Sequence, residues 1–191
     1  ITLRFPMPLK DKVEHYSQKQ QLDPALTYAV IRRESAFMAD ARSSVGALGL
    51  MQIMPGTARR VARHMNLPYG GKYSLLSADT NLNLGTSYLS QMLKRLDSQP
   101  VLATAAYNAG PNRVMDWLPQ NAPLEAIRWI ETIPFTETRE YVSNVLTYSV
   151  IYQHRMAQTY TRLTQNMPPV QPRNSQTQTA AVQNPANKHG S

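Results

Sequence analysis

Apolar residues recur every three or four positions along most of the chain, which is the pattern of helices that bury one face. Leu26, Ala29 and Val30 form one such stripe, and Tyr141 and Val145 belong to another. No segment alternates apolar and polar residues as a half-buried strand would. The expected helices span residues 9–20, 24–34, 55–65, 79–96, 101–108, 113–118, 124–131 and 136–156. We therefore predict a mainly α, multi-helix globular domain with little or no β structure.

Residues that favour helix ends mark several of these boundaries. Asp23, which precedes a proline, is expected to cap the second helix. Asp79 and Thr136 are expected to cap the helices that follow them. The segment MADARSSVGALG (38–49) is rich in small and polar residues and is predicted to be a loop.

Changes of composition at both ends divide the chain into three parts. Residues 1–8 mix apolar residues with two prolines and are predicted to form an extended strap or junction. Residues 9–166 carry the periodic pattern and are expected to form one compact domain. Residues 167–191 are rich in Pro, Gln, Asn and Ser and contain no acidic or aromatic residue. Such a segment buries too little apolar surface to offset its ordering entropy, so we predict a disordered polar tail.

The charge of the chain favours an anionic partner. Among 191 residues there are 20 Lys and Arg against 12 Asp and Glu, which gives a net charge of +8. Nucleic acid, anionic lipid and cell-wall polymer all fit this charge. The densest basic group is Arg59, Arg60 and Arg63, although three arginines on one helix are more typical of a solvated face.

Several functional classes are excluded by residues that the chain lacks. It has no cysteine, so disulfides, thiolate metal sites and a cysteine nucleophile are excluded. Its histidines, His15, His64, His154 and His189, do not have the spacing of metal ligands. No apolar run reaches the ~18 to 20 residues of a membrane span, and no signal sequence opens the chain. Since the chain begins with Ile1, we interpret it as a mature or excised part of a longer exported protein.

Four segments combine polar side chains with glycine or a helix start inside apolar surroundings: RRESAF, VGALGLMQIMP, AYNAG and IPFTETREYV. In the first, apolar neighbours of Glu34 would raise the pKa of its carboxyl group, as a general acid requires. The alternative is a helix-end glutamate that pairs with Arg32 or Arg33. In the second, the Lys and Ser or Thr of a phosphate-binding loop are missing, which disfavours nucleotide binding and leaves a Met-rich core turn as the alternative.

The other two segments also have structural alternatives. Tyr107 and Asn108 precede a Gly-Pro break that would turn them into a cleft, but a tyrosine at a helix end is more often core filling. Glu137 lies in a first helical turn, where favourable interaction with the helix dipole would be enough to explain it.

In their order and spacing, the four segments resemble the catalytic domain of soluble lytic transglycosylases, over about residues 3–160. The resemblance implies a lysozyme-like fold of the goose type for residues 9–166. It identifies Glu34 as the catalytic acid and base. It also implies a set of substrate-binding residues: Ser43, Gln52, Met54, Tyr107, Asn108, Glu137 and Tyr141.

The same resemblance implies cleavage of the β-1,4 bond between N-acetylmuramic acid and N-acetylglucosamine in peptidoglycan, with formation of 1,6-anhydro ends. Glycosidases usually employ two carboxylates, and Asp40, Glu131 and Glu137 are the nearest candidates for a second one. None of them occupies a recognised nucleophile position, so Glu34 is expected to act alone. No metal or organic cofactor is expected. Peptidoglycan strands in the periplasm are the expected partner, and other cell-wall enzymes are left open as partners.

Three alternative functions stay open at this point. A true lysozyme of the same fold would release reducing ends through attack by water. A non-catalytic module that binds peptidoglycan would keep the groove without the chemistry, which the presence of Glu34, Gln52 and Tyr107 disfavours. A basic nucleic-acid binder would fit the net charge, but the chain has no aromatic and basic RNA-binding signature, so no nucleic-acid partner is expected.

Overall fold

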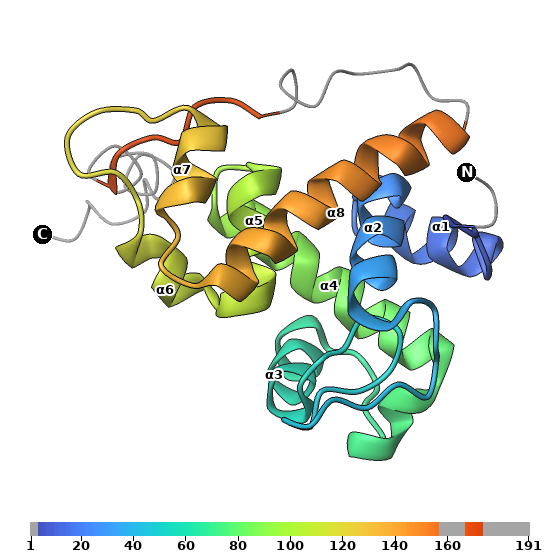
Figure 1. The fold of residues 1–191 in the computed structure, drawn as a ribbon. Helices are drawn as coiled ribbons and strands as arrows, with labels where there is room; N and C mark the ends of the chain where they lie inside the picture. Colours follow the sequence, from blue (N-terminus) through green and yellow to red (C-terminus); the bar gives the residue numbers. More distant parts are fainter. Residues whose placement is uncertain (1–3, 157–166, 174–191) are drawn as a thin grey trace, which may run out of the picture.

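The computed structural model describes residues 4–156 and 167–173, and this part of the chain is built from helices (Figure 1). The elements are α1 (Lys10–Lys19), α2 (Pro24–Ser35), α3 (Pro55–Met65), the 3-10 helix η1 (Lys72–Leu76), α4 (Ala78–Arg95), α5 (Pro100–Ala109), α6 (Pro111–Asp116), α7 (Ala126–Thr132) and α8 (Thr136–Arg155). Within the described residues β pairing is limited to three isolated bridges. The prediction of a mainly α fold is therefore confirmed.

One of the three expected helix caps forms as predicted. The Oδ1 atom of Asp23 accepts a hydrogen bond from the backbone N–H of Ala25 at 2.8 Å, at the start of α2. The prediction for Asp79 was wrong, because Ser77 holds the N-cap position of α4 and Asp79 lies in the first turn. There its carboxylate accepts a hydrogen bond from Lys12 Nζ on α1 at 2.6 Å, so a contact between helices replaces the local cap.

The start of α8 and the short helix η1 also differ from the expectation. Thr136 is the first residue of α8, and Phe135 holds the N-cap position. The hydroxyl of Thr136 accepts a hydrogen bond from Arg139 at 2.9 Å, which uses the oxygen that a cap would need. The helix η1 was not predicted, because five residues are too few to show a helical period.

Helix α8 crosses the molecule, and α2 packs along it from Tyr141 to Gln153 (Figure 1). Helix α5 packs between α4 and α8, and the short helices α6 and α7 lie on its side of the molecule. Helix α3 and the long loop that precedes it form the lower part of the view and pack on α4. The start of α8 and the end of α2 therefore both come near this loop.

The buried apolar side chains form three clusters, and α4 contributes to all of them. Its Met92 belongs to the cluster formed by α5, α6 and α7. Leu82 and Leu89 belong to a cluster between α1, α2 and α8. Leu84 packs in the third cluster, with α3 and the loop before it. Helix α4 therefore packs both on the cluster of α1, α2 and α8 and on the cluster of α3 and the loop before it.

The buried side chain of Asn81, on α4, makes several hydrogen bonds to the long loop between α2 and α3 and to η1. Its Nδ2 donates hydrogen bonds to the carbonyls of Leu48 and Leu75, each at 2.8 Å. Its Oδ1 accepts from the backbone N–H of Met51, also at 2.8 Å. Gly49 has a φ of +75°, and a Cβ atom there would lie 2.3 Å from Asn81 Nδ2, so only glycine fits. These contacts fix the loop to α4.

The first described residues, 4–9, lie beside α2 and α8 and include a bend and turns, so the extended conformation predicted for the strap is not seen there. The hydroxyl of Tyr28 donates to the carbonyl of Pro8 at 3.2 Å, and that of Tyr152 donates to Pro6 at 3.1 Å. The ring of Phe5 lies edge-on to Tyr152 at 5.8 Å between centroids. The predicted strap covered residues 1–8, of which the first three lie outside the described residues.

The segment 167–173 differs from the predicted disordered tail. Met167 and Val170 are buried in the cluster of α5 to α7, and Val170 exchanges two backbone hydrogen bonds with Leu124 at 2.9 and 2.8 Å. Burial of these two apolar side chains stabilises the ordered conformation of the segment, although most of the residues around them in the sequence are polar or proline. The remainder of the predicted tail, 174–191, lies outside the described residues.

The role of Asn81 predicts a loss of stability on truncation. Asn81→Ala removes the hydrogen bonds to the Met51 N–H and the Leu75 carbonyl and one of the two donors to the Leu48 carbonyl, which also accepts from Ile53 N–H at 3.2 Å. Each buried group left without a partner costs about 1 to 3 kcal/mol when water does not replace the bond. We expect the free energy of unfolding in urea to fall by at least about 2 kcal/mol. Asn83→Ala is the matched control, because that side chain accepts only a bond of 3.4 Å from the exposed Lys19. Equal losses in the two variants would contradict the prediction.

Candidate active site

Glu34 lies in the last turn of α2 and faces α8. The hydroxyl of Tyr141, on α8, donates a hydrogen bond to Glu34 Oε1 at 2.7 Å. The neighbouring Ser35 donates from its hydroxyl to the carbonyl of Leu50 at 2.8 Å, which ties the end of α2 to the loop. Ala36 follows with a φ of +48°, so the chain leaves the helix here. A carboxyl group is thus held at a helix end by two other segments.

The environment of Glu34 raises the pKa of its carboxyl group from 4.5 to about 7. Burial is the main cause, because it penalises the charged carboxylate, and the negative charge of Glu137 adds to it. The hydrogen bond from Tyr141 and the positive charge of Arg33 act in the opposite direction. Near neutral pH, Glu34 can therefore both give and take a proton.

The alternative that Glu34 is an ion-paired surface residue is wrong. Within the described residues, the ion pairs join Lys10 to Glu14, Lys12 to Asp79 and Arg173 to Asp116. The guanidinium of Arg33 instead lies over the ring of Tyr141, 5.5 Å from its centroid. Glu34 is thus left with a neutral hydrogen-bond donor.

Glu34 lines two neighbouring cavities. The first, which we call the groove, has a volume of about 510 Å³ and lies between the loop, α3, α5 and the start of α8. It is lined by Glu34, Ser43, Val45, Ala47, Gln52, Ile53, Met54, Thr57, Arg60, Tyr88, Tyr107, Asn108, Ala109, Gly110, Pro111 and Glu137. Six of the seven predicted substrate-binding residues are among them. The exception is Tyr141.

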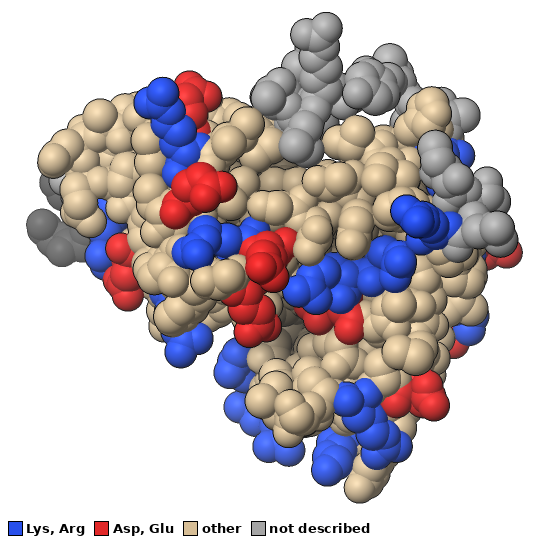
Figure 2. Space-filling model, in the orientation of Figure 1, with Lys and Arg blue, Asp and Glu red and all other residues tan. Residues whose placement is uncertain are grey.

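The second cavity, which we call the arginine hollow, lies on the other side of Glu34 and has a volume of about 630 Å³. It is lined by Arg32, Arg33, Glu34, Ser35, Ala36, Met38, Ala41, Arg42, Ser43, Gln52, Asn144 and Tyr148. Glu34, Ser43 and Gln52 line both cavities, so the two are parts of one depression. Figure 2 shows this face hollowed between the start of α8 and the α3 region, with acidic side chains on one rim and basic ones close by.

Ser43 and Gln52 use part of their polar groups to shape the loop. The hydroxyl of Ser43 accepts a hydrogen bond from the backbone N–H of Ala47 at 2.9 Å. Gln52 has a φ of +44°, and its Nε2 donates to the carbonyls of Gly49 and Ala41 at 2.8 and 3.1 Å. Only Oε1 of Gln52 is therefore left for a ligand. Ser43 and Gln52 therefore stabilise the loop through these hydrogen bonds and also line the two cavities.

Tyr107 and Asn108 also have structural partners while they line the groove. Tyr107 is 8% exposed, and its hydroxyl donates to the carbonyl of Met51 at 2.9 Å. The Oδ1 atom of Asn108 accepts from the hydroxyl of Thr138 at 2.7 Å, so its amide nitrogen is free to donate toward the groove. These bonds connect α5 to the loop and to α8.

The remaining predicted residues divide into groove and buried positions. Met54 is 42% exposed and presents an apolar surface to the groove. Tyr141 is 1% exposed and lines neither cavity, so it acts on the site only through Glu34. Of the three candidates for a second carboxylate, only Glu137 lines a cavity with Glu34.

Several residues of the site were not predicted from the sequence. They are Arg33, Asn81, Tyr88, Asn144 and Tyr148. The sequence contained one indication that Asn81 has a structural role, because it is a polar residue next to Leu82 in a helix with a buried apolar side. The others lie at positions that have no special residue type or spacing, so only their placement in the fold identifies them.

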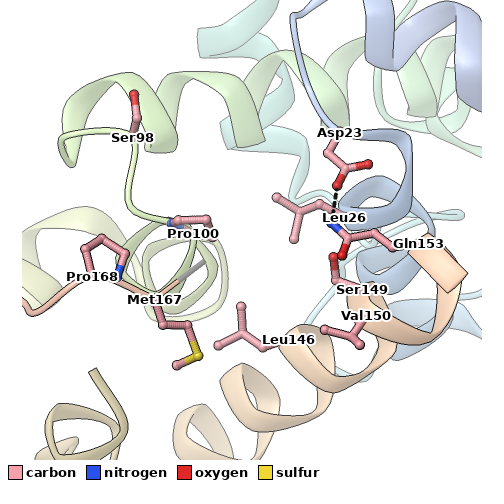
Figure 3. Close-up of a pocket in the computed structure, with 10 residues that line it drawn as sticks. All are labelled: Asp23, Leu26, Ser98, Pro100, Leu146, Ser149, Val150, Gln153, Met167 and Pro168. Carbon is pink, nitrogen blue, oxygen red and sulfur yellow. Dashed lines mark hydrogen bonds between the residues drawn. The ribbon is translucent and has the colours of Figure 1, made fainter. Parts of the chain in front are cut away.

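A third cavity, of about 300 Å³, lies away from Glu34, between α8, the start of α5 and the segment that begins at Met167 (Figure 3). Its one carboxylate belongs to Asp23, which caps α2 and also accepts a hydrogen bond from Gln153 Nε2 at 2.7 Å. The predicted site residues do not line it. Its acidic group is therefore engaged in structure.

The described residues contain no group of three or more His, Cys, Asp or Glu side chains that could hold a metal ion. In the same part of the chain, no helix is long and apolar enough to cross a membrane.

Comparison with known families and proteins agrees with this geometry. The family described as Transglycosylase SLT domain matches residues 11–130, and the family described as Soluble lytic transglycosylase helical domain matches residues 132–160. A soluble lytic murein transglycosylase from Salmonella typhimurium is 43% identical over 157 residues, which are 81% of this chain and 24% of that protein. The chain thus spans about a quarter of the length of the curated relatives that it matches.

Two solved structures share the fold. An inactive mutant of the lytic transglycosylase Slt from Pseudomonas aeruginosa has a TM-score of 0.80 and 46% identity, over 83% of this chain and 26% of that one. The 70 kDa soluble lytic transglycosylase from Escherichia coli has a TM-score of 0.83 and 38% identity, over 88% of this chain and 28% of that one. The lysozyme-like fold predicted from the sequence is therefore confirmed.

The hydrogen bond from Tyr141 predicts a change in the titration of Glu34. Tyr141→Phe removes a donor that stabilises the carboxylate, so we expect the pKa of Glu34 to rise above about 7. A rise of about one pH unit corresponds to one hydrogen bond to a charged group. Carbon-13 NMR titration of the carboxyl group measures it. Tyr88→Phe is the control, since Tyr88 also lines the groove and has no hydrogen bond to Glu34 among the described contacts. An unchanged or lower pKa in Tyr141→Phe would contradict the assignment.

The raised pKa also predicts how stability depends on pH. Because the folded protein holds the proton of Glu34 up to about pH 7 and the unfolded chain releases it near 4.5, the wild type loses stability as the pH rises between these values. Glu34→Gln removes this loss. We expect the variant to be more stable than the wild type at pH 8 by about 2 to 3 kcal/mol, with little difference at pH 4. Urea unfolding at the two pH values tests it, and equal differences at both would refute it.

Proposed function

The chain belongs to the transglycosylase SLT domain family, and from this premise we propose that it is a peptidoglycan lytic transglycosylase with Glu34 as its only acid and base. The bond cleaved is the β-1,4 bond between N-acetylmuramic acid and N-acetylglucosamine. The observation that carries the proposal is one partly buried carboxyl group, with a pKa raised to about 7, at the junction of two cavities. No metal ion or organic cofactor takes part in the proposed reaction.

In the first step Glu34 acts as a general acid. Its proton passes to the glycosidic oxygen, the bond from that oxygen to C1 of the muramic residue breaks, and the N-acetylglucosamine portion leaves as an alcohol. Since Oε1 accepts the hydrogen bond from Tyr141, Oε2 is the oxygen that carries the proton. The same hydrogen bond then stabilises the carboxylate that remains.

In the second step the Glu34 carboxylate acts as a general base. It removes the proton from the C6 hydroxyl of the muramic residue while that oxygen bonds to C1, which yields a 1,6-anhydro ring and restores neutral Glu34. No water is consumed, so the two products together have the mass of the substrate. A hydroxyl within the same sugar reacts with a high effective concentration, which favours it over water.

The groove supplies the contacts that hold the sugars on one side of Glu34. Gln52 Oε1 and the amide nitrogen of Asn108 are polar groups left available there. Met54 and Tyr107 offer apolar surface for sugar rings. We assign Ser43 and Glu137 to substrate contacts as well, and Tyr141 to the positioning of Glu34. Glu137 also keeps Glu34 protonated through its negative charge.

Residues 9–166 are the proposed catalytic domain, with residues 1–8 as its entering strap. We also propose that the protein acts in the periplasm, where its substrate lies, in turnover or remodelling of the cell wall. The net charge of +8 supports binding to a polymer that carries peptide carboxylates.

The test of the proposed function uses Glu34→Gln, which keeps the size of the side chain and its capacity to accept from Tyr141. Loss of the only acid and base is expected to lower kcat on purified sacculi by about a thousandfold, with the fold retained. Dye release from labelled sacculi measures the rate, and circular dichroism checks the fold. A variant that keeps most of its wall-lytic activity would contradict the role of Glu34.

Mass spectrometry of the wild-type products separates this reaction from that of a lysozyme. Anhydro products lie one water below hydrolytic ones, so we expect the lower mass. Products that carry the added water would favour a lysozyme, and binding to sacculi without any release would favour a module without catalytic activity.

A further inference from the structure

Thr138 has no part in the reaction described above, although it contacts a residue that lines the groove. It lies in the first turn of α8 and is 2% exposed. Its hydroxyl donates a hydrogen bond to Asn108 Oδ1 at 2.7 Å, across the contact between α5 and α8. A buried hydroxyl needs a partner for its proton, and Asn108 is that partner. The same bond fixes a side chain of the groove.

The usual partner of a helical threonine is not used here. Such a hydroxyl commonly donates to the backbone carbonyl three or four residues earlier in its own helix. Thr147, also on α8, does so and donates to the carbonyl of Ser143 at 2.8 Å. The hydroxyl of Thr138 instead joins α8 to the last turn of α5.

The bond decides which end of the Asn108 amide faces the groove. An asparagine amide has an acceptor oxygen and a donor nitrogen, and a half turn exchanges the two. Because Thr138 holds Oδ1, Nδ2 lies on the opposite side. Nδ2 has no hydrogen bond within the described structure, and it is not one of the buried polar atoms that lack one. Since Asn108 lines the groove, it presents a donor there.

A donor of fixed orientation selects the kind of ligand atom that it binds. A sugar hydroxyl can adapt to either end of an amide, because it both donates and accepts. A carbonyl oxygen can only accept, so it needs the nitrogen end. N-acetylmuramic acid and N-acetylglucosamine each carry an acetamido group with such a carbonyl. A fixed amide is therefore of use for an acetamido carbonyl and of little use for a hydroxyl.

We propose that Thr138 is a positioning residue, which holds Asn108 as a hydrogen-bond donor to an acetamido carbonyl of the bound glycan strand. The inference rests on the proposed function, because it concerns the same substrate and the same groove. Thr138 itself lines neither the groove nor the arginine hollow. Its hydroxyl therefore contributes to binding through Asn108.

Thr138→Val tests the proposal, since valine has nearly the shape of threonine and lacks the hydroxyl. In this variant Oδ1 of Asn108 stays without a partner while Nδ2 binds the glycan, so we expect KM for soluble, uncross-linked glycan strands to rise about tenfold. We expect kcat to change by less than about twofold, because a contact equally strong in the ground and transition states acts on KM. Thr138→Ser restores the hydroxyl and should bring KM back to within about twofold of the wild type.

A double-mutant cycle shows whether Thr138 acts through Asn108. Asn108→Ala removes the amide, so adding Thr138→Val to that variant should leave KM unchanged. Two effects that multiply in the double variant mean that the residues act independently, and this result overturns the inference.

Asn108→Asp tests whether the groove needs a donor. It keeps an acceptor for Thr138 and offers the groove oxygen in place of nitrogen. We expect its KM to rise at least as far as that of Asn108→Ala. A KM equal to that of the wild type is incompatible with a donated hydrogen bond and overturns the inference.

The division between KM and kcat separates positioning of Asn108 from a general disturbance of α8. Tyr141 lies one turn after Thr138 and bonds Glu34, so a displaced helix lowers kcat and changes the pH profile. Lower kcat at unchanged KM in Thr138→Val, or an equal effect in Thr138→Ser, contradicts the proposed role. Thr147→Val is the matched control, because Thr147 is exposed on the same helix and lines neither cavity, and its kinetics should equal those of the wild type.

The remaining outcomes are also decisive. If Thr138→Val does not fold, Thr138→Ala removes the same hydroxyl without a methyl group in its place, and it must show the same rise in KM and the same coupling to Asn108. Anhydro products from all variants, with independent effects on KM, overturn the inference and leave the proposed function intact. A wild type that yields no anhydro product contradicts the proposed function itself.

Discussion

The contact of α2 with α8 is the interaction on which the site depends, because it brings together residues 107 positions apart in the sequence, Glu34 and Tyr141. Buried aromatic side chains fill this contact. Tyr28 stacks on Tyr152 at 5.1 Å between centroids, and the strap packs Phe5 against the same ring. Because these rings hold the two helices together, the last turn of α2 lies against α8. The carboxyl group of Glu34, in that turn, is thereby shielded from most of the solvent.

Burial of this carboxyl group has opposite effects on stability and on function. The same loss of water that raises the pKa of Glu34 to about 7 destabilises the folded protein once the group ionises. Tyr141 and Arg33 oppose the rise, and Glu137 reinforces it. The balance leaves a group that exchanges its proton near neutral pH, which a single residue acting first as acid and then as base requires.

The second wall of the site depends on buried hydrogen bonds as well as on its apolar cluster. Asn81 satisfies three backbone groups of the loop and of η1, and Gly49 permits the close approach that these bonds need. Ser35 adds a bond from the end of α2 to Leu50, and Tyr107 adds one from α5 to Met51. A loop without regular structure is thereby joined to α2, α4 and α5, and it presents Gln52 and Ser43 to both cavities.

The sequence by itself determined the helical class, most helix positions and the segments that form the site, because helical periodicity and short motifs are local properties. It could not decide between an ion-paired and a buried Glu34, since that depends on Tyr141, which lies on another helix. Asp79 shows the same limit, because a lysine on α1 took the carboxylate that local rules assigned to a cap. The packing of residues 167–173 and the grouping of Arg32, Arg33 and Arg42 around one hollow were likewise decided by tertiary structure. Contacts between distant segments produce no periodic pattern in the sequence. They decide how deeply a side chain such as Glu34 is buried and which charged groups surround it.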